Sequence, residues 1–195
     1  RRAEKQLHLQ SSALNAAANG IVITDITGTV EWVNPAFSEL TGYSLEEALG
    51  KNPRELVKSG KHDAAFFKLM WDTILSGNVW RSELINRRKD GTLYFEEEAI
   101  TPVWDENGQM SHFIAIKQDI TKRKQAEEER ERLLEQVQDQ AEQMNQIMRS
   151  VSEGIFLLDA AGQIVVANPH AEEYLALLAG TAVGATLTTL GDVPL

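Results

Sequence analysis

The chain of 195 residues is long enough for one ordinary domain with extensions, and its 43% hydrophobic content supports a buried core. Its formal net charge of −10 argues against a nucleic-acid partner, because phosphate binding needs a clustered basic surface. The absence of cysteine excludes disulfides, thiolate nucleophiles and thiolate metal sites. No apolar run approaches the length of a membrane span and no signal peptide is visible, so we expect a soluble, cytoplasmic segment without direct membrane insertion.

The first 120 residues predict a helix followed by a mixed unit of strands and helices. Residues 1–18 carry Ala3, Leu7 and Leu14 at heptad-like spacing, which predicts an N-terminal helix, and Gly20 follows as a stop signal. Strands are expected at 20–25, 29–33, 79–88, 92–103 and 110–118, with short helices between 35 and 56 and a long helix at 63–75. This order indicates an α+β fold, with a five-stranded antiparallel sheet and a helical flank.

An internal repeat marks the start of two similar units. Residues 20–35, GIVITDITGTVEWVNP, return 134 positions later as residues 154–169, GIFLLDAAGQIVVANP, and Gly50 and Gly184 extend the correspondence. Each copy predicts two strands joined by an Asp-x-x-Gly turn, followed by an Asn-Pro pair that opens a short helix. A shared fold is the economical explanation, and a chance similarity between two hairpins is the alternative.

The segment between the two copies predicts a coiled coil. Its composition changes to charged helix formers, and an apolar seam advances by three and four residues in turn through Leu134, Val137, Ala141, Met144, Met148 and Val151. Glu127 and Arg130 occupy the same seam upstream, so we expect loose packing at 122–130 and tight packing from residue 134 onward. We predict a homodimer through the helices at 1–18 and 121–153, the latter as a parallel coiled coil; a single helix that packs on its own domain is the alternative.

The second copy ends much earlier than the first. Its last residue, Leu195, corresponds to residue 61 of the first copy, ahead of the long helix and the final three strands. We therefore expect a second unit that cannot close a full sheet on its own. The expected segments are an N-terminal helix at 1–19, a complete unit at 20–120, a coiled-coil linker helix at 121–153 and a truncated second unit at 154–195.

Several motifs of the first unit resemble those of PAS-domain sensors. In chain order they are GIVITD, WVNPAF, TGYSLEEALGKNP at 41–53, NRRKDGTLYFEE at 86–97, and QDIT at 118–121 running straight into a helix. The resemblance covers residues 10–121 well and 144–195 in part. It implies a tandem PAS protein with a partial second PAS unit, and a PAS fold that can host haem, flavin, small acids or no ligand.

Within that family, the stretches GKN and NRRKDGTLY are similar to the flavin-binding, redox-sensing PAS group of the NifL type. In that group the flavin lies between the long helix and the sheet, contacted by a helix Trp and a strand Asn, and Trp71 and Asn86 match those positions. An indole supplies a flat apolar wall, and a carboxamide offers a donor and an acceptor to the pyrimidine edge of the ring. The resemblance thus implies an FAD site formed by Trp71, Asn86, Asn52 and Trp80. Pro53 departs from the pattern, because that group has a Glu contact there.

A similarity to light-sensing LOV domains carries a different chemistry. The segment GKNPREL resembles their flavin loop, but Pro53 occupies the position of the adduct-forming cysteine, which rules out cysteinyl adduct formation. Glu96 and Lys117 stand where LOV domains usually carry Asn and Gln. The recognition of the flavin edge in that group is therefore not reproduced in this chain.

Other interpretations of the candidate side chains stay open. Haem PAS domains use a histidine on or near the long helix, and His62 is the histidine of that region; we expect it to serve the turn or to face water, beside Asp63 as a helix cap. An empty or small-ligand pocket is a further alternative, because Trp71 and Trp80 also suit ordinary core packing. The acidic run 96–98 alternates along a strand, and we expect a solvated sheet edge rather than catalytic carboxylates.

The leading hypothesis is a sensory input module that senses redox or oxygen status through a flavin and relays the signal through a dimeric coiled coil. The resemblance implies a downstream output domain, a histidine kinase of a two-component system or a diguanylate cyclase/phosphodiesterase. We expect the segment itself not to be an enzyme, since the sequence has no G-x-S-x-G, P-loop or H-E-x-x-H motif. A ligand-free dimerisation and relay module is the alternative from another class.

Overall fold

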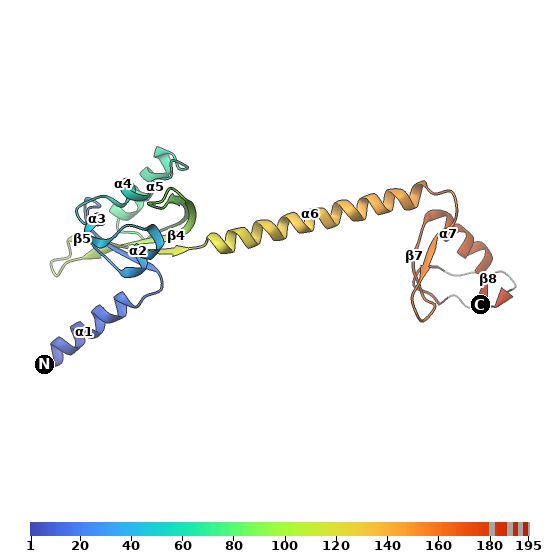
Figure 1. Ribbon diagram of the computed structural model, residues 1–195, viewed down its shortest axis with the longest axis horizontal. Coiled ribbons are helices and arrows are strands. Elements are labelled where there is room, and N and C mark those ends of the chain that lie inside the picture. Colours follow the sequence, from blue (N-terminus) through green and yellow to red (C-terminus); the bar gives the residue numbers. More distant parts are fainter. Residues whose placement is uncertain (180–181, 187–188, 191–192, 195) are drawn as a thin grey trace. The chain divides into compact units, whose positions relative to one another are not determined.

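Figure 1 shows the computed structural model of the chain, which describes residues 1–179, 182–186, 189–190 and 193–194. By their contacts the residues form two compact units, Arg1–Glu127 and Glu128–Leu195. Within the predicted second unit at 154–195, residues 180–181, 187–188, 191–192 and 195 lie outside the described residues. None of the helices that the structure describes is both long and apolar enough to cross a membrane.

The first unit is an antiparallel sheet with helices over one face (Figure 1). Its elements are α1 (Arg2–Asn15), β1 (Gly20–Asp25), β2 (Val30–Val33), α2 (Pro35–Thr41), α3 (Leu45–Ala48), α4 (Pro53–Val57), α5 (Ala64–Leu75), β3 (Trp80–Arg87), β4 (Leu93–Trp104) and β5 (Met110–Asp119), followed by the start of α6 (Thr121–Ser150). The five strands lie in the order β2-β1-β5-β4-β3, and every neighbouring pair is antiparallel. The predicted α+β fold with a five-stranded antiparallel sheet is confirmed.

The core of this unit lies between the sheet and the helices α2–α5. Phe37 of α2 and Ile74 of α5 are fully buried against Val22 and Phe113 of the sheet. Strands alternate between an inner and an outer face, so only every second residue of each strand reaches this core. Helix α1 has no buried residue. Side chains on the inner face of β3, β4 and β5 therefore line the space between the sheet and the helices.

Asn34 joins three elements of the first unit. Its Oδ1 accepts hydrogen bonds from the backbone N–H of Ile21 at 2.8 Å and of Phe37 at 3.0 Å, which caps the start of α2. Its Nδ2 donates to the carbonyl oxygens of Asn19 at 2.9 Å and Leu14 at 3.2 Å. This buried carboxamide uses both of its ends, and it ties the last turn of α1 to β1 and α2.

The second unit repeats this arrangement bond for bond. Asn168 Oδ1 accepts from the N–H of Ile155 and of Ala171, and its Nδ2 donates to the carbonyl oxygens of Glu153 and Met148. Each of these five residues lies 134 positions after its counterpart in the first unit. The shared fold predicted from the repeat is therefore confirmed for the start of both units, and Asn168 ties the end of α6 to the second unit.

The second unit contains short elements around a small core. They are β6 (Phe156–Leu158), β7 (Ile164–Ala167), α7 (Pro169–Tyr174), the π-helix η1 (Leu175–Ala179), β8 (Thr189–Leu190) and β9 (Val193–Pro194). β6 pairs with β7 and β8 with β9, each pair antiparallel. Ile164 and Leu175 form the buried centre of this unit.

Helix α6 is continuous over 30 residues and has no buried residue. The first part of the predicted seam is open to solvent in this single chain, with Leu134, Val137 and Met144 exposed by 52%, 61% and 59%, whereas Met148 and Val151 are half-buried and Val151 follows the end of α6. An exposed apolar stripe of this length on a charged helix is what a partner helix would cover.

Candidate functional site

A cavity of about 260 Å³ lies between helices α4 and α5 and the inner face of the sheet. Apolar side chains form most of its wall, including Met70 and Ile74 from α5 and Leu84, Ile100 and Phe113 from the strands. Its polar side chains are Thr24, Asn52, Arg54, Glu55, Lys58, Asn86, Glu98 and Lys117. The site is thus a mainly apolar pocket with polar groups on the sheet and on the α4 side.

Three of the four residues implied by the resemblance line this cavity: Trp71, Asn86 and Asn52. Trp71 lies on α5 with its ring edge-to-face to Phe113, at 6.0 Å between ring centroids. Asn52 caps α4, because its Oδ1 accepts from the N–H of Arg54 at 3.0 Å. These residues come from separate parts of the sequence, and the fold brings them to one wall.

Trp80 lies elsewhere. It is buried in the core, where it packs edge-to-face on Phe66 at 5.6 Å between ring centroids, and it is not among the residues that line the cavity. His62 is also outside the lining. Its Nε2 accepts a hydrogen bond from the N–H of Ile85 at 2.8 Å, and its ring stacks on Phe66 at 4.4 Å. The expectation that His62 serves the turn or faces water was therefore wrong, because its ring packs on Phe66 and accepts a hydrogen bond from β3.

Gly28 closes the cavity wall beside the candidate residues. It adopts φ +84° in the turn between β1 and β2, a conformation that favours glycine. A Cβ at this position would lie 2.8 Å from Asn52 Nδ2 and 2.9 Å from the Trp71 ring. The Asp-x-x-Gly turn therefore serves the site as well as the hairpin, because the glycine allows both side chains to approach the backbone.

A buried charge cluster lies at the floor of the cavity, where Asn86, Glu98 and Lys117 belong to the lining and Glu96 does not. Lys117 Nζ lies 2.7 Å from Glu96 Oε1 and 2.6 Å from Glu98 Oε1, and Asn86 Nδ2 donates to Glu96 Oε1 at 2.9 Å. Lys117, Glu96 and Glu98 are only 2%, 0% and 7% exposed. The expectation of a solvated sheet edge was therefore wrong for Glu96 and Glu98, because the alternation of β4 turns both toward Lys117 and leaves Glu97 on the other face.

Burial and charge act against each other in this cluster. Burial raises the pKa of the Glu98 carboxyl above its ordinary value, although the Lys117 ammonium works in the opposite direction. Burial also opposes the charged form of Lys117, but the carboxylates of Glu96 and Glu98 outweigh it and hold the pKa of Lys117 above its ordinary value. Lys117 therefore stays protonated throughout the physiological range, as a fixed positive charge at the cavity.

Unused hydrogen-bonding capacity remains next to this cluster. Among the residues that the structure describes, Glu96 Oε2 and the Tyr94 hydroxyl are buried without a hydrogen-bond partner. Burial and then the neighbouring Glu96 raise the pKa of the Tyr94 hydroxyl, so it stays protonated. Buried polar atoms of this kind are costly and are usually satisfied by a ligand, a water or a small movement.

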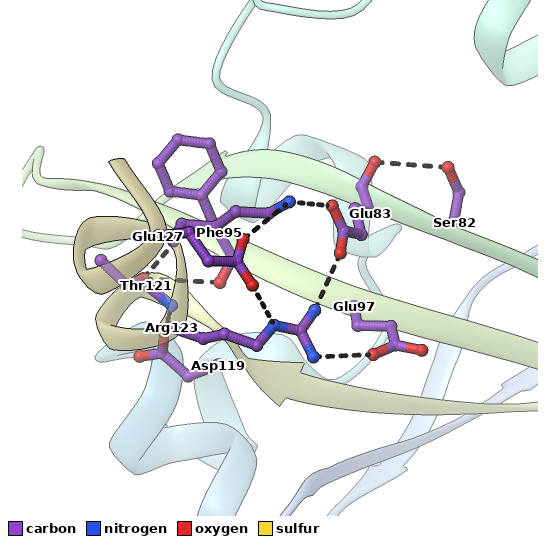
Figure 2. Close-up of polar contacts among 9 residues, drawn as sticks. Ser82, Glu83, Phe95, Glu97, Asp119, Thr121, Arg123 and Glu127 are labelled. Carbon is purple, nitrogen blue, oxygen red and sulfur yellow. Dashed lines mark hydrogen bonds and ion pairs between the residues drawn. The ribbon is translucent and has the colours of Figure 1, made fainter. Parts of the chain in front are cut away.

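The start of α6 is bound to the same strand, β4, that carries the cluster (Figure 2). The N–H of Ile120 donates to the Phe95 carbonyl at 2.9 Å, and the N–H of Phe95 donates to Thr121 Oγ1 at 3.0 Å. Asp119 Oδ1 accepts from the N–H of Thr121, and its Oδ2 pairs with Arg88. Although partial burial opposes them, the hydrogen bonds from Thr121 and Arg88 hold the pKa of Asp119 below its ordinary value.

Comparisons with known proteins identify two regions of the chain, one in each of the two repeated units. Residues 18–122 match a family described as PAS domain, and residues 142–193 match a second family of the same description. The nitrogen fixation regulatory protein of Klebsiella oxytoca is 40% identical over 105 residues, which make up 54% of this chain and 21% of that protein. The hybrid signal transduction histidine kinase L of Dictyostelium discoideum is 26% identical over 182 residues, 89% of this chain and 10% of that protein. The chain therefore spans about a fifth or less of these curated relatives.

One solved structure also resembles this chain. The structure of a light-oxygen-voltage domain studied with a flavin analogue resembles this chain with a TM-score of 0.51 at 25% identity. The match covers 62% of this chain and 93% of that one. The likeness extends over most of that domain.

Proposed function

Because this chain belongs to the PAS domain family, we propose that it is the sensory input part of a longer signalling protein and that the cavity of its first unit binds FAD. The observation that carries the proposal is the convergence of an indole, two carboxamides and a buried ammonium at one cavity: Trp71, Asn52, Asn86 and Lys117. They come from α5, the start of α4, β3 and β5. Redox or oxygen status is the signal that such a cofactor would report.

The shape and polarity of the cavity suit the ring system of a flavin. Trp71 and Phe113 offer aromatic surface, and the apolar wall continues along α5. The bond from Asn86 to Glu96 uses one of the two N–H groups of the amide, so the other N–H is available to a ligand. The cavity, at about 260 Å³, is smaller than the roughly 300 Å³ at which ligand pockets begin, so much of FAD would extend beyond it. The similar light-oxygen-voltage domain studied with a flavin analogue adds support.

When bound, the flavin would supply reversible oxidation and reduction. The residues of the chain would hold the ring, keep the Lys117 ammonium with its two carboxylate partners beside it, and connect it to α6. Glu96, which pairs with Lys117, directly follows Phe95, whose backbone holds Ile120 and Thr121. We expect a change of charge at the cavity to act on β4 and through it on the start of α6.

Loss of the proposed contacts tests the site. We expect Trp71→Ala and Asn86→Ala each to weaken FAD binding by roughly tenfold or more, which corresponds to about 1.4 kcal/mol of binding free energy per factor of ten. The first variant loses the flat aromatic wall, and the second loses the contact with the edge of the flavin ring. The measurement is a titration of the full chain with FAD, followed by flavin absorbance and fluorescence. Trp104→Ala is the matched control, since Trp104 is 52% exposed and lies outside the cavity. Equal affinity of all four proteins would contradict the assignment.

The signal would leave the chain through a dimer of α6. We propose a parallel homodimer along the seam from Leu134 to Val151, with α1 as a second contact, and an output domain outside this chain. The relative from Dictyostelium discoideum, a histidine kinase by name, supports a kinase as the output, and a diguanylate cyclase or phosphodiesterase is the other candidate.

Charges placed in the seam test the dimer. We expect Leu134→Lys/Met144→Lys to raise the dimer dissociation constant at least about tenfold, because both ammonium groups would face the partner's seam. Sedimentation of the full chain over a range of concentrations measures this constant. The control Gln136→Lys/Gln143→Lys adds the same charge on another side of α6. The seam is not the interface if both variants associate like the parent chain.

A second candidate function is a relay module without a ligand. One observation favours it: Lys117 already has two carboxylate partners and Asn86 one, so the polar floor of the cavity is largely satisfied by the chain itself. This candidate predicts that dimerisation is insensitive to FAD and that the purified chain stays colourless.

A further inference from the structure

The first two turns of α6 lie against the sheet through ion pairs. Arg123 Nη2 lies 2.8 Å from Glu83 Oε1 (Figure 2). Lys124 Nζ lies 2.5 Å from the other oxygen of the same carboxylate. Arg123 also lies 3.8 Å from Glu97 and 3.9 Å from Glu127. Two basic residues of the helix thus meet one glutamate from each of β3 and β4, 40 and 26 positions earlier in the chain.

These ion pairs are weak enough to break and form again. Arg123 and Glu83 are 46% and 44% exposed, and pairs at such positions are weak and screened by salt. The hydrogen bond from Lys124 lowers the pKa of Glu83, so this carboxylate is charged at neutral pH. The contact is therefore held by charge near the surface, where Lys124 and Glu97 are 27% and 32% exposed.

The side of α6 that carries Arg123 continues into the apolar stripe of the predicted coiled coil. Arg123, Glu127 and Arg130 lead, by steps of four and three residues, into the exposed apolar stripe that begins at Leu134 and Val137. The helix side that meets Glu83 and Glu97 at its start is thus the side that would face a partner helix further along. The residues on this side of α6 can therefore either contact the sheet or extend the surface that would face a partner helix.

The contact lies on the outer face of β3 and β4, the strands whose inner face lines the cavity. Glu97 lies between Glu96 and Glu98, which hold Lys117, and Glu83 precedes Leu84, which lines the cavity. A shift of β3 or β4 would therefore move the carboxylates that hold the helix.

We propose that Glu83 and Glu97 form an ionic clamp on Arg123 and Lys124, which holds the start of α6 on the sheet and opens without unfolding of the first unit. The clamp would regulate the relay from the cavity to α6, and in this respect the inference rests on the proposed function. Opening needs only the loss of exposed charge pairs, while Ile120 and Thr121 stay bound to Phe95 as the hinge.

A distance measurement on the full chain tests the clamp. The chain has no cysteine, so spin labels can be attached at Thr101→Cys on β4 and Gln125→Cys on α6. In this background Glu83→Gln/Glu97→Gln should lower the docked population several-fold and broaden the distance distribution. Raising the salt from about 0.1 M to about 1 M, which shortens the Debye length from about 10 Å to about 3 Å, should do the same to the parent.

Two controls separate the clamp from a general loss of structure. Glu106→Gln/Glu128→Gln removes the same charge from exposed positions outside the clamp and should leave the distances unchanged. Reversing all four charges, with Glu83→Lys/Glu97→Lys/Arg123→Glu/Lys124→Glu, should restore the docked distance, whereas either half alone should not. Unchanged distances in Glu83→Gln/Glu97→Gln and in high salt would overturn the clamp. No ligand is needed, so a failure to bind FAD would count against the proposed function alone.

Discussion

Replacement of Lys117 by methionine should destabilise the first unit by about 3–5 kcal/mol at neutral pH, because it leaves two buried carboxylates without their cation. Both Glu96 and Glu98 lie within 2.7 Å of the ammonium and are buried. Chemical denaturation, followed by the fluorescence of the buried Trp80, measures the free energy of unfolding.

The pH dependence of this variant has a definite sign. A carboxyl whose pKa is raised by folding binds its proton more tightly in the folded state, so Glu98 lowers the free energy of unfolding as the pH rises from the ordinary carboxyl value to that raised value. Loss of Lys117 removes the group that holds this pKa down. The cost of Lys117→Met should therefore be smallest in acid and should grow as the pH rises to neutral.

A triple variant is the matched control. Glu96→Gln/Glu98→Gln/Lys117→Met removes all three charges and should recover much of the lost stability, because no buried charge is left unpaired. A cost of Lys117→Met below about 1 kcal/mol, or a cost that does not change with pH, would contradict the account of the cluster.

Asn34→Ala should also have a large effect, about 2–4 kcal/mol, because four hydrogen bonds are lost and the buried N–H of Ile21 loses its acceptor, whereas the N–H of Phe37 keeps the backbone carbonyl of residue 34. The bonds run to Ile21, Phe37, Leu14 and Asn19. Unfolding of the first unit in denaturant measures the cost. An effect below about 0.5 kcal/mol, typical of surface positions, would show that the bonds are dispensable.

Asn34→Asp separates the two ends of the side chain. An aspartate keeps the acceptor for Ile21 and Phe37 but has no donor for the carbonyl oxygens of Leu14 and Asn19. We expect α2 to stay capped while α1 exchanges its amide hydrogens faster. Asn168→Ala is the parallel change in the second unit, where the same loss should free the end of α6.

The sequence predicts the frame of the fold because its signals are local. The order of strands, the Asp-x-x-Gly turns of the two copies, with φ +84° at Gly28 and +76° at Gly162, and the Asp63 cap of α5 depend on neighbouring residues. The repeat likewise indicates that Asn34 opens a helix. Its bonds to the carbonyl oxygens of Leu14 and Asn19 are not visible in the sequence, because they depend on the path of the preceding chain.

The candidate site could be predicted only in part. Alternation along β4 indicates that Glu96 and Glu98 share a face, but it does not say which face is buried. That depends on the register that places Glu98 opposite Lys117 on β5. The resemblance points to Trp71 and Asn86, and both line the cavity. The same resemblance points to Trp80, which is not part of the lining. The contact of Arg123 with Glu83 spans 40 positions and has no local signal.

The absorption spectrum of the purified full chain is the most direct test of whether the cavity of the first unit binds a flavin. The chain is incubated with FAD, separated from free flavin and compared with Trp71→Ala treated in the same way. The account predicts the bands of oxidised flavin in the parent chain and their loss in the variant. A parent chain that remains colourless, or one that shows the Soret band of haem instead, would contradict it.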